Sequence, residues 1–122
     1  MWTYQQSTGN LTDPYGKVIG VGYAGHGPGI DNPADEEIRN IGPLPTGKYT
    51  IGPFYDDPHG KGPLVAHLIP DPANEMYGRS GMMIHGDTAA HNQTASEGCI
   101  VLAHNLRAAI ASSLDDDLLV IA

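Results

Sequence analysis

Basic residues are scarce in this sequence. Six lysines and arginines stand against 14 aspartates and glutamates among 122 residues, which gives a formal net charge of −8 at pH 7. Such a chain is repelled by the phosphates of nucleic acids and of anionic lipids. The composition therefore argues against nucleic acid as a partner, and any anionic ligand would have to be recognised by local contacts rather than by long-range attraction.

Long apolar runs and cysteine pairs are also lacking. No segment approaches the roughly 20 apolar residues that span a bilayer. The first residues, Met1 to Gln6, lack the basic and apolar regions of a secretory signal peptide. Cys99 is the only cysteine, so no internal disulfide can form. We expect a protein that inserts into no membrane, carries no classical signal peptide and needs no oxidising compartment to fold.

Glycine and proline, in contrast, are abundant. The 16 glycines and 10 prolines interrupt the chain too often for long helices and favour short strands joined by turns. The length suits one domain with one core. We predict a single, mostly β domain over residues 1–122. Its expected elements are strands at 2–11, 17–23, 63–69, 82–84, 100–102 and 118–121, a strand after Pro45-Thr46-Gly47, one or two helical turns at 32–37, and a short helix at 105–113.

The residues with the clearest chemical potential are His85 and Cys99, which stand fourteen positions apart on either side of a polar loop. Apolar runs at 82–84 and 100–102 flank this loop, a pattern that predicts a hairpin with a long connection. Side chains alternate along a strand, so Met83 and His85 share one face of the first strand, and Cys99 and Val101 share one face of the second. In one register of the two strands, the imidazole lies beside the thiol.

A neighbouring imidazole would make Cys99 reactive. A free thiol has a pKa of about 8.5, so little thiolate exists at neutral pH unless a base takes the proton and the resulting cation stabilises the anion. Gly86 and Gly98 would let the backbone approach a substrate, and the N–H groups of Gly98 and Cys99 could form an oxyanion site. The alternative is a structural cysteine, because free cysteines are among the most buried residues in proteins.

At these residues the chain resembles the L,D-transpeptidase family of peptidoglycan enzymes. The family signature is a His-Gly pair, a variable loop and then Ser-His-Gly-Cys; here His85-Gly86 and Ser96-Glu97-Gly98-Cys99 match it, with Glu97 in place of the second histidine. The forms Ile-His-Gly-Asp and Ser-Glu-Gly-Cys look most like a small subgroup that includes antibacterial effectors of type VI secretion systems. A Pro-x-Gly followed by an aromatic strand residue, here Tyr49, extends the resemblance over roughly residues 4–102.

The resemblance implies a cysteine enzyme of the bacterial cell wall. Cys99 would be the nucleophile and His85 the base, with the carbonyl of Gly86 or an acceptor such as Ser96 fixing the imidazole tautomer. The thiolate would attack the carbonyl at the L-centre of a stem-peptide residue, usually meso-diaminopimelate, and expel D-Ala. Water, a free D-amino acid or another stem amine would then resolve the acyl-enzyme. The protein would be an L,D-carboxypeptidase or L,D-transpeptidase without metal or cofactor, built as a compact β-sandwich or barrel with one short helix after the catalytic strand.

Four further residues are candidate contacts to the substrate. The guanidinium of Arg79 could clamp a peptide carboxylate with two hydrogen bonds, although a surface salt bridge to one of the 14 acidic residues is an equal alternative. Tyr77 could point its hydroxyl into the cleft, and Asp87 and Glu97 lie within the motif segments. Because Glu97 cannot donate as an imidazolium would, we expect its carboxylate to orient the loop by accepting from backbone N–H groups.

Two other functions fit parts of the sequence. His85, Asp87 and His91, with His104 as a further candidate, offer metal ligands at close spacing, as a zinc metallopeptidase of peptidoglycan would need. Paired histidines on one helix face or a His-x-His strand, which zinc peptidases usually use, are absent from the sequence. The third possibility is a non-catalytic module that binds the cell wall, in which His85 and Cys99 only pack.

The substrate class implied by the resemblance lies outside the cytoplasmic membrane. Because the sequence shows no secretory signal, we expect a secretion apparatus, a fused partner or a lysis pathway to deliver the protein to the periplasm. Peptidoglycan stem peptides are the expected substrates, and an immunity protein is an expected partner. We expect a monomer that acts as an antibacterial toxin by removing or exchanging terminal D-Ala.

Overall fold

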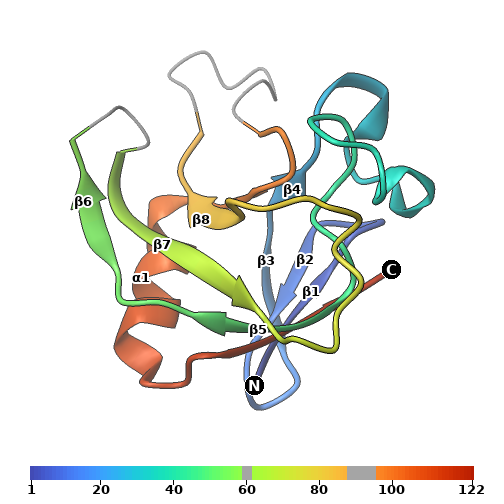
Figure 1. Ribbon diagram of the computed structural model, residues 1–122. Coiled ribbons are helices and arrows are strands. Elements are labelled where there is room, and N and C mark those ends of the chain that lie inside the picture. The colour runs from blue at the N-terminus through green and yellow to red at the C-terminus, as the bar shows by residue number, and fades with distance from the viewer. Residues whose placement is uncertain (59–61, 88–95) are drawn as a thin grey trace.

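The computed structural model describes residues 1–58, 62–87 and 96–122 (Figure 1). The strands are β1 (Trp2–Gln5), β2 (Asn10–Thr12), β3 (Val18–Val21), β4 (Tyr23–Ala24), β5 (Gly47–Ile51), β6 (Tyr55–Asp57), β7 (Gly62–Pro70), β8 (Met83–His85), β9 (Ile100–Val101) and β10 (Asp117–Ile121). Two 3₁₀ turns, η1 (Gly27–Gly29) and η2 (Pro33–Asp35), and the helix α1 (His104–Ser113) complete the described elements. The prediction of a mostly β fold with one short helix after the cysteine strand is confirmed.

The strands form one sheet that curls into a nearly closed barrel. Nine of them follow the order β3-β2-β1-β10-β5-β7-β8-β9-β4, and β6 pairs with β7 outside this path. The two ends of the path, β3 and β4, are consecutive in the chain and separated only by Gly22, so the chain itself connects the two edges. A Cβ at Gly22 would lie 2.2 Å from the carbonyl oxygen of Val101, and only glycine fits there.

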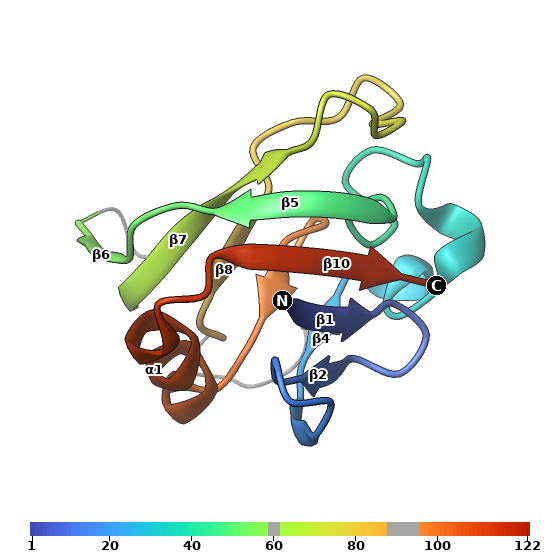
Figure 2. The same cartoon turned by 90° about the horizontal axis from the view of Figure 1, so that it is seen from below.

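Alternating burial directs one face of each strand into the barrel. In β1 the buried residues are Trp2 and Tyr4, and in β10 they are Leu118 and Val120. β1 and β10 pair in parallel although they are the first and last strands described, and Figure 2 shows them side by side between β2 and β5. Helix α1 packs against β7. The core is completed from the other strands and from α1 by residues that include Tyr49, Leu68, Ile84, Ile100, Leu106 and Ile110.

Several elements lie where the sequence predicts them. The helical turn expected at 32–37 is η2. Asn32 caps its start, because the side-chain oxygen of Asn32 accepts from the N–H of Ala34 at 3.2 Å. The strand after Pro45-Thr46-Gly47 is β5, the helix at 105–113 is α1, and the last strand is β10. No helix within the described ranges combines the length and the apolar character needed to cross a bilayer.

Three predictions about strands are wrong. The strand predicted at 17–23 is divided at Gly22 into β3, which pairs with β2, and β4, which pairs with β9. The strand predicted at 2–11 is divided into β1 and β2, because Gly9, with a φ of 74°, completes a turn and donates its N–H to the carbonyl of Gln5 at 2.8 Å. The hairpin predicted from β8 and β9 is also wrong, because these strands pair in parallel. A parallel connection needs about a dozen residues or more, and the segment 86–99 provides that length.

Candidate active site

His85 ends strand β8, and only 1% of its side chain is exposed. Its Nδ1 lies 2.7 Å from the carbonyl oxygen of Gly86. A carbonyl can only accept, so Nδ1 carries the proton, and in the neutral form of the ring the lone pair is on Nε2. Of the two acceptors suggested for this imidazole, the structure places the Gly86 carbonyl in that position. The arrangement leaves Nε2 as the atom that can take a proton.

Cys99 directly precedes β9, and its side chain is partly exposed. In the parallel register His85 is the partner of Val101, and the N–H of Leu102 donates to the carbonyl of His85 at 3.0 Å. Paired residues point to the same side of a sheet and side chains alternate along each strand, so His85, Val101 and Cys99 project from one face. Cys99 stands two positions before Val101, the partner of His85, and directly before the first residue of β9. This placement brings the thiol to the side of the sheet from which the imidazole projects.

Ser96 shapes the loop that precedes the thiol. Its side chain is completely buried, and its Oγ accepts from the N–H groups of Gly25 and Gly98, both at 3.0 Å. The same hydroxyl donates to the carbonyl of Cys99 at 2.6 Å. These bonds also change the expected oxyanion site, because the N–H of Gly98 already donates to Ser96.

Arg79 lies beneath the same loop, and 5% of its side chain is exposed. Its Nη1 donates to the carbonyl oxygens of Glu36 and Pro43 at 2.5 and 2.7 Å. Its Nη2 donates to the carbonyl oxygens of Gly42 and Glu97 at 2.9 and 3.1 Å. The guanidinium thus binds the protein's own backbone, and a substrate carboxylate would have to compete with these four acceptors. The predicted carboxylate clamp stays a prediction.

Both glycines of the motif lie against a buried guanidinium. A Cβ at Gly98, whose φ is 142°, would lie 2.5 Å from Nη2 of Arg79, and a Cβ at Gly86 would lie 2.3 Å from Nη1 of Arg107. Arg107 belongs to the first turn of α1, donates from Nη1 to the carbonyl of Leu102 at 3.3 Å, and has its pKa lowered by burial. The two glycines were predicted to let the backbone approach a substrate. In the structure, the lack of a side chain at both positions also leaves room for the two guanidinium groups.

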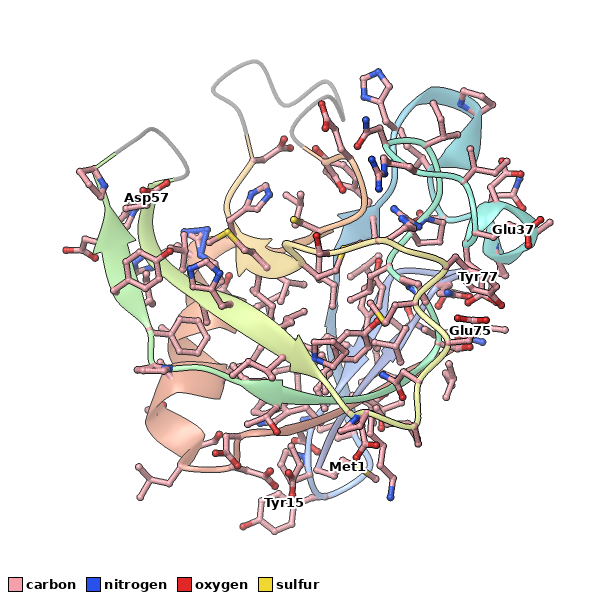
Figure 3. The ribbon with its side chains drawn as sticks, in the orientation of Figure 1. Met1, Tyr15, Glu37, Asp57, Glu75 and Tyr77 are labelled. Atoms are coloured by element: carbon pink, nitrogen blue, oxygen red, sulfur yellow. The ribbon has the colours of Figure 1, made fainter. Side chains whose placement is uncertain are left out.

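Tyr77 lies away from these residues. It is 41% exposed, and Figure 3 shows it beside Glu37 and Glu75 at the right-hand edge of the molecule, whereas β8 lies near the centre of that view. Negative charge on Glu36, then desolvation and the charges of Glu75 and Glu37, raise the pKa of the Tyr77 hydroxyl. The described contacts therefore place Tyr77 on an acidic surface, and its contact with substrate stays a prediction.

Asp87 and Glu97 flank the site in different ways. Asp87 follows β8, and its Oδ1 accepts from the hydroxyl of Tyr23 on β4 at 2.8 Å. The side chain of Glu97 is exposed, and its carboxylate makes no hydrogen bond with any described residue. The expected contact of this carboxylate with backbone N–H groups is therefore absent from the described part of the chain. The carbonyl of Glu97 anchors the loop instead, by accepting from Arg79.

The alternative of a metal centre requires several ligands in one place. In residues 1–58, 62–87 and 96–122, no three His, Cys, Asp or Glu side chains are grouped closely enough to hold a metal ion. Nδ1 of His85 is engaged by the Gly86 carbonyl, and His104 is exposed on α1. His91 lies outside the described residues.

Sequence reasoning missed three residues that contact the site. The carbonyl of Gly81 accepts from Sγ of Cys99 at 3.7 Å, Tyr23 holds Asp87, and Arg107 lies against Gly86. Only Arg107 had a signal in the sequence, because it is an arginine in the first turn of the helix that follows the cysteine strand. The contact of Tyr23 depends on the pairing of β4 with β9, and that of Gly81 on how the segment before β8 packs against the residue before β9, and no local pattern reveals either.

Comparison with known proteins identifies one family. The family model described as the Tlde1 domain matches residues 20–116 of the chain. The matched segment runs from the last residues of β3 to the residue before β10 and contains both motif segments. Neither the curated proteins nor the solved structures include a match.

Proposed function

Since the chain belongs to the Tlde1 domain family, we propose that it is a cysteine-dependent enzyme that acts on peptidoglycan stem peptides as an antibacterial effector. The resemblance to the L,D-transpeptidases, and within them to type VI secretion effectors, rests on two segments, His85-Gly86 and Ser96-Glu97-Gly98-Cys99. Both segments lie inside the matched range. The reaction we propose is removal or exchange of the terminal D-Ala after the diamino acid.

The observation that carries this proposal is the parallel register of β8 and β9. It projects His85 and Cys99 from one face of adjacent strands, while the Gly86 carbonyl holds the proton on Nδ1. A thiol whose neighbour is a neutral imidazole with its lone pair on Nε2 has the partner that a cysteine nucleophile needs. A cysteine that only packs would not require this orientation of the ring.

In the proposed reaction, Nε2 of His85 takes the proton of the Cys99 thiol, and the sulfur attacks the carbonyl carbon at the L-centre of the stem-peptide residue. The C–N bond to D-Ala breaks, and the imidazolium returns its proton to the leaving amine. The product is a thioester on Cys99. Water attacks the thioester with His85 again as base, which releases a carboxylate and the thiol, or a free D-amino acid takes the place of water and gives exchange.

We favour a small acceptor over a second stem peptide. The thiol is only partly exposed, and its Sγ lies against the carbonyl of Gly81. Water or a free D-amino acid reaches the carbonyl carbon of a thioester on such a sulfur more easily than the amine of another bulky stem does. Trimming or exchange would deplete the tetrapeptide donors that cross-linking enzymes use, and it would weaken the wall.

The test is mass spectrometry of muropeptides after incubation of tetrapeptide stems with the pure protein. We expect loss of the terminal D-Ala, and its replacement when a free D-amino acid such as D-Met is added. Cys99→Ala should leave the stems intact, and His104→Ala, a change at an exposed position of α1, should act as the wild type does. Unchanged stems with the wild type, cleavage at another bond, or equal products with Cys99→Ala would contradict the proposal. New cross-links would instead identify a transpeptidase of the ordinary kind.

The proposed place of action has a separate test. The protein should be harmless when it is expressed in a bacterial cytoplasm and toxic when a fused signal peptide sends it to the periplasm. The toxicity should disappear with Cys99→Ala. Toxicity confined to the cytoplasm, or equal toxicity of the variant, would contradict action on the cell wall.

A further inference from the structure

Arg79 carries a buried positive charge that is held by neutral groups. Its four acceptors are the backbone carbonyls of Glu36, Gly42, Pro43 and Glu97, and within the described residues it makes no salt bridge with a carboxylate. Burying a charge costs free energy that hydrogen bonds to carbonyl oxygens offset only in part. Because no carboxylate pairs directly with the guanidinium, its positive field also acts on ionisable groups nearby.

The nearest part of the candidate site is the loop that carries the nucleophile. The guanidinium binds the carbonyl of Glu97, and its Nη2 fills the space where a Cβ of Gly98 would be. These are the two residues directly before Cys99. The loop has a second anchor on the same neighbouring segment, where the N–H of Leu44 donates to the carbonyl of Gly98 at 2.9 Å. Arg79 therefore joins the nucleophile loop to the segments at Glu36 and at 42–43.

The charge of Arg79 and that of Cys99 influence each other. Burial is the strongest influence on Arg79 and lowers its pKa, whereas negative charge on Tyr49, Cys99 and Glu36 raises it and the charge of Arg39 lowers it. An interaction by which a thiolate favours the cation is, by reciprocity, one by which the cation favours the thiolate. Among the described residues, the other titratable groups on the segments packed around the thiol are His85, Asp87, Tyr23, Glu97 and Arg107.

We propose that Arg79 is a positioning residue for the nucleophile: its charge stabilises the thiolate of Cys99, and its four hydrogen bonds hold the loop 96–99 so that the thiol faces His85. The inference rests on the proposed role of Cys99 as nucleophile, but it concerns the thiol itself and can be tested without a substrate. It also explains why the residue before the cysteine is glycine, because any side chain there would displace the guanidinium.

The test is the pH dependence of alkylation of Cys99 by iodoacetamide, which reports the pKa of the only thiol in the chain. Arg79→Met removes the charge and the donors but keeps an unbranched apolar stem. We expect the midpoint of its pH profile to rise by about one unit or more, which makes alkylation about tenfold slower at a pH below both midpoints. The matched control is Arg39→Met, which removes an equal charge from an exposed neighbour whose Nη2 donates to the carbonyl of Gly78 at 3.2 Å. Its midpoint should remain that of the wild type.

Loss of four hydrogen bonds could also unfold Arg79→Met, so each variant is first checked by circular dichroism. If Arg79→Met is unfolded, Arg79→Lys takes its place: an ammonium keeps the charge but cannot reach all four carbonyls, and we expect a smaller rise of the midpoint. A folded variant at Arg79 with the wild-type midpoint, or an equal rise with Arg39→Met, would overturn the inference. Because alkylation involves no peptidoglycan, failure of the proposed function would leave these midpoints unaffected.

Discussion

Ser96→Ala tests whether the buried serine holds the nucleophile loop, as its contacts indicate. The change leaves two buried N–H groups, those of Gly25 and Gly98, and the partly buried carbonyl of Cys99 without their partner. A hydrogen bond contributes about 0.5–1.5 kcal/mol net, and a buried polar group left unsatisfied costs about 1–3 kcal/mol. Because water can reach the partly buried carbonyl, we expect the free energy of unfolding to fall by about 2–4 kcal/mol. That is a large part of the roughly 5–15 kcal/mol by which most domains are stable.

The assay is urea unfolding followed by the fluorescence of Trp2, the only tryptophan, which is buried and donates from Nε1 to the hydroxyl of Ser113 at 3.1 Å. Ser112→Ala is the matched control, because Ser112 is exposed on α1 and bonds only to carbonyls of its own helix. Its stability should stay within about 0.5 kcal/mol of the wild type. A Ser96→Ala protein as stable as this control would show that Ser96 does not hold the nucleophile loop. If Ser96→Ala keeps the stability of the wild type but loses turnover, Ser96 takes part in the reaction and not only in the structure of the loop.

Three further predictions concern the reaction. Iodoacetamide should abolish turnover by labelling Cys99, while EDTA should leave the rate unchanged; activity that EDTA removes and zinc restores would favour the metallopeptidase. His85→Ala should lower kcat/KM by about 10²-fold or more, the usual scale for a general base, and equal damage from His104→Ala would contradict the assignment. Glu97→Gln should keep most of the activity, because the carboxylate is exposed and bonds to no described residue; a rate as low as that of Cys99→Ala would mean that the carboxylate transfers a proton.

Local patterns in the sequence predict many of the elements because their physical causes are local. Asn32 and Pro33 begin η2 through a side-chain cap and a fixed φ, and Leu106 and Ile110 mark the buried face of α1. The direction of β9 relative to β8 is not encoded in this way. Short apolar runs can pair in either direction, and the packing of the whole barrel decides between them.

In the candidate site, too, some features follow from local sequence and others only from the packing of the whole fold. His85 and Cys99 stand out in the sequence because of their chemistry and spacing, but the partners that hold them are backbone groups. The carbonyl of Gly86 fixes the ring, and four carbonyls bind Arg79. Every residue has a carbonyl, so the type of a residue does not predict such a contact. An arginine is normally exposed, and its burial could not be foreseen from Tyr77-Gly78-Arg79 alone.

The proposed function requires that Cys99 forms a thioester with the stem peptide. The most direct measurement is the intact mass of the protein after rapid mixing with a tetrapeptide stem and acid quenching within the first turnover. We predict an adduct with the mass of the stem acyl group without its terminal D-Ala, located on the peptide that contains Cys99 and absent from Cys99→Ala. Release of D-Ala at the wild-type rate by Cys99→Ala, or an adduct on another residue, would contradict it.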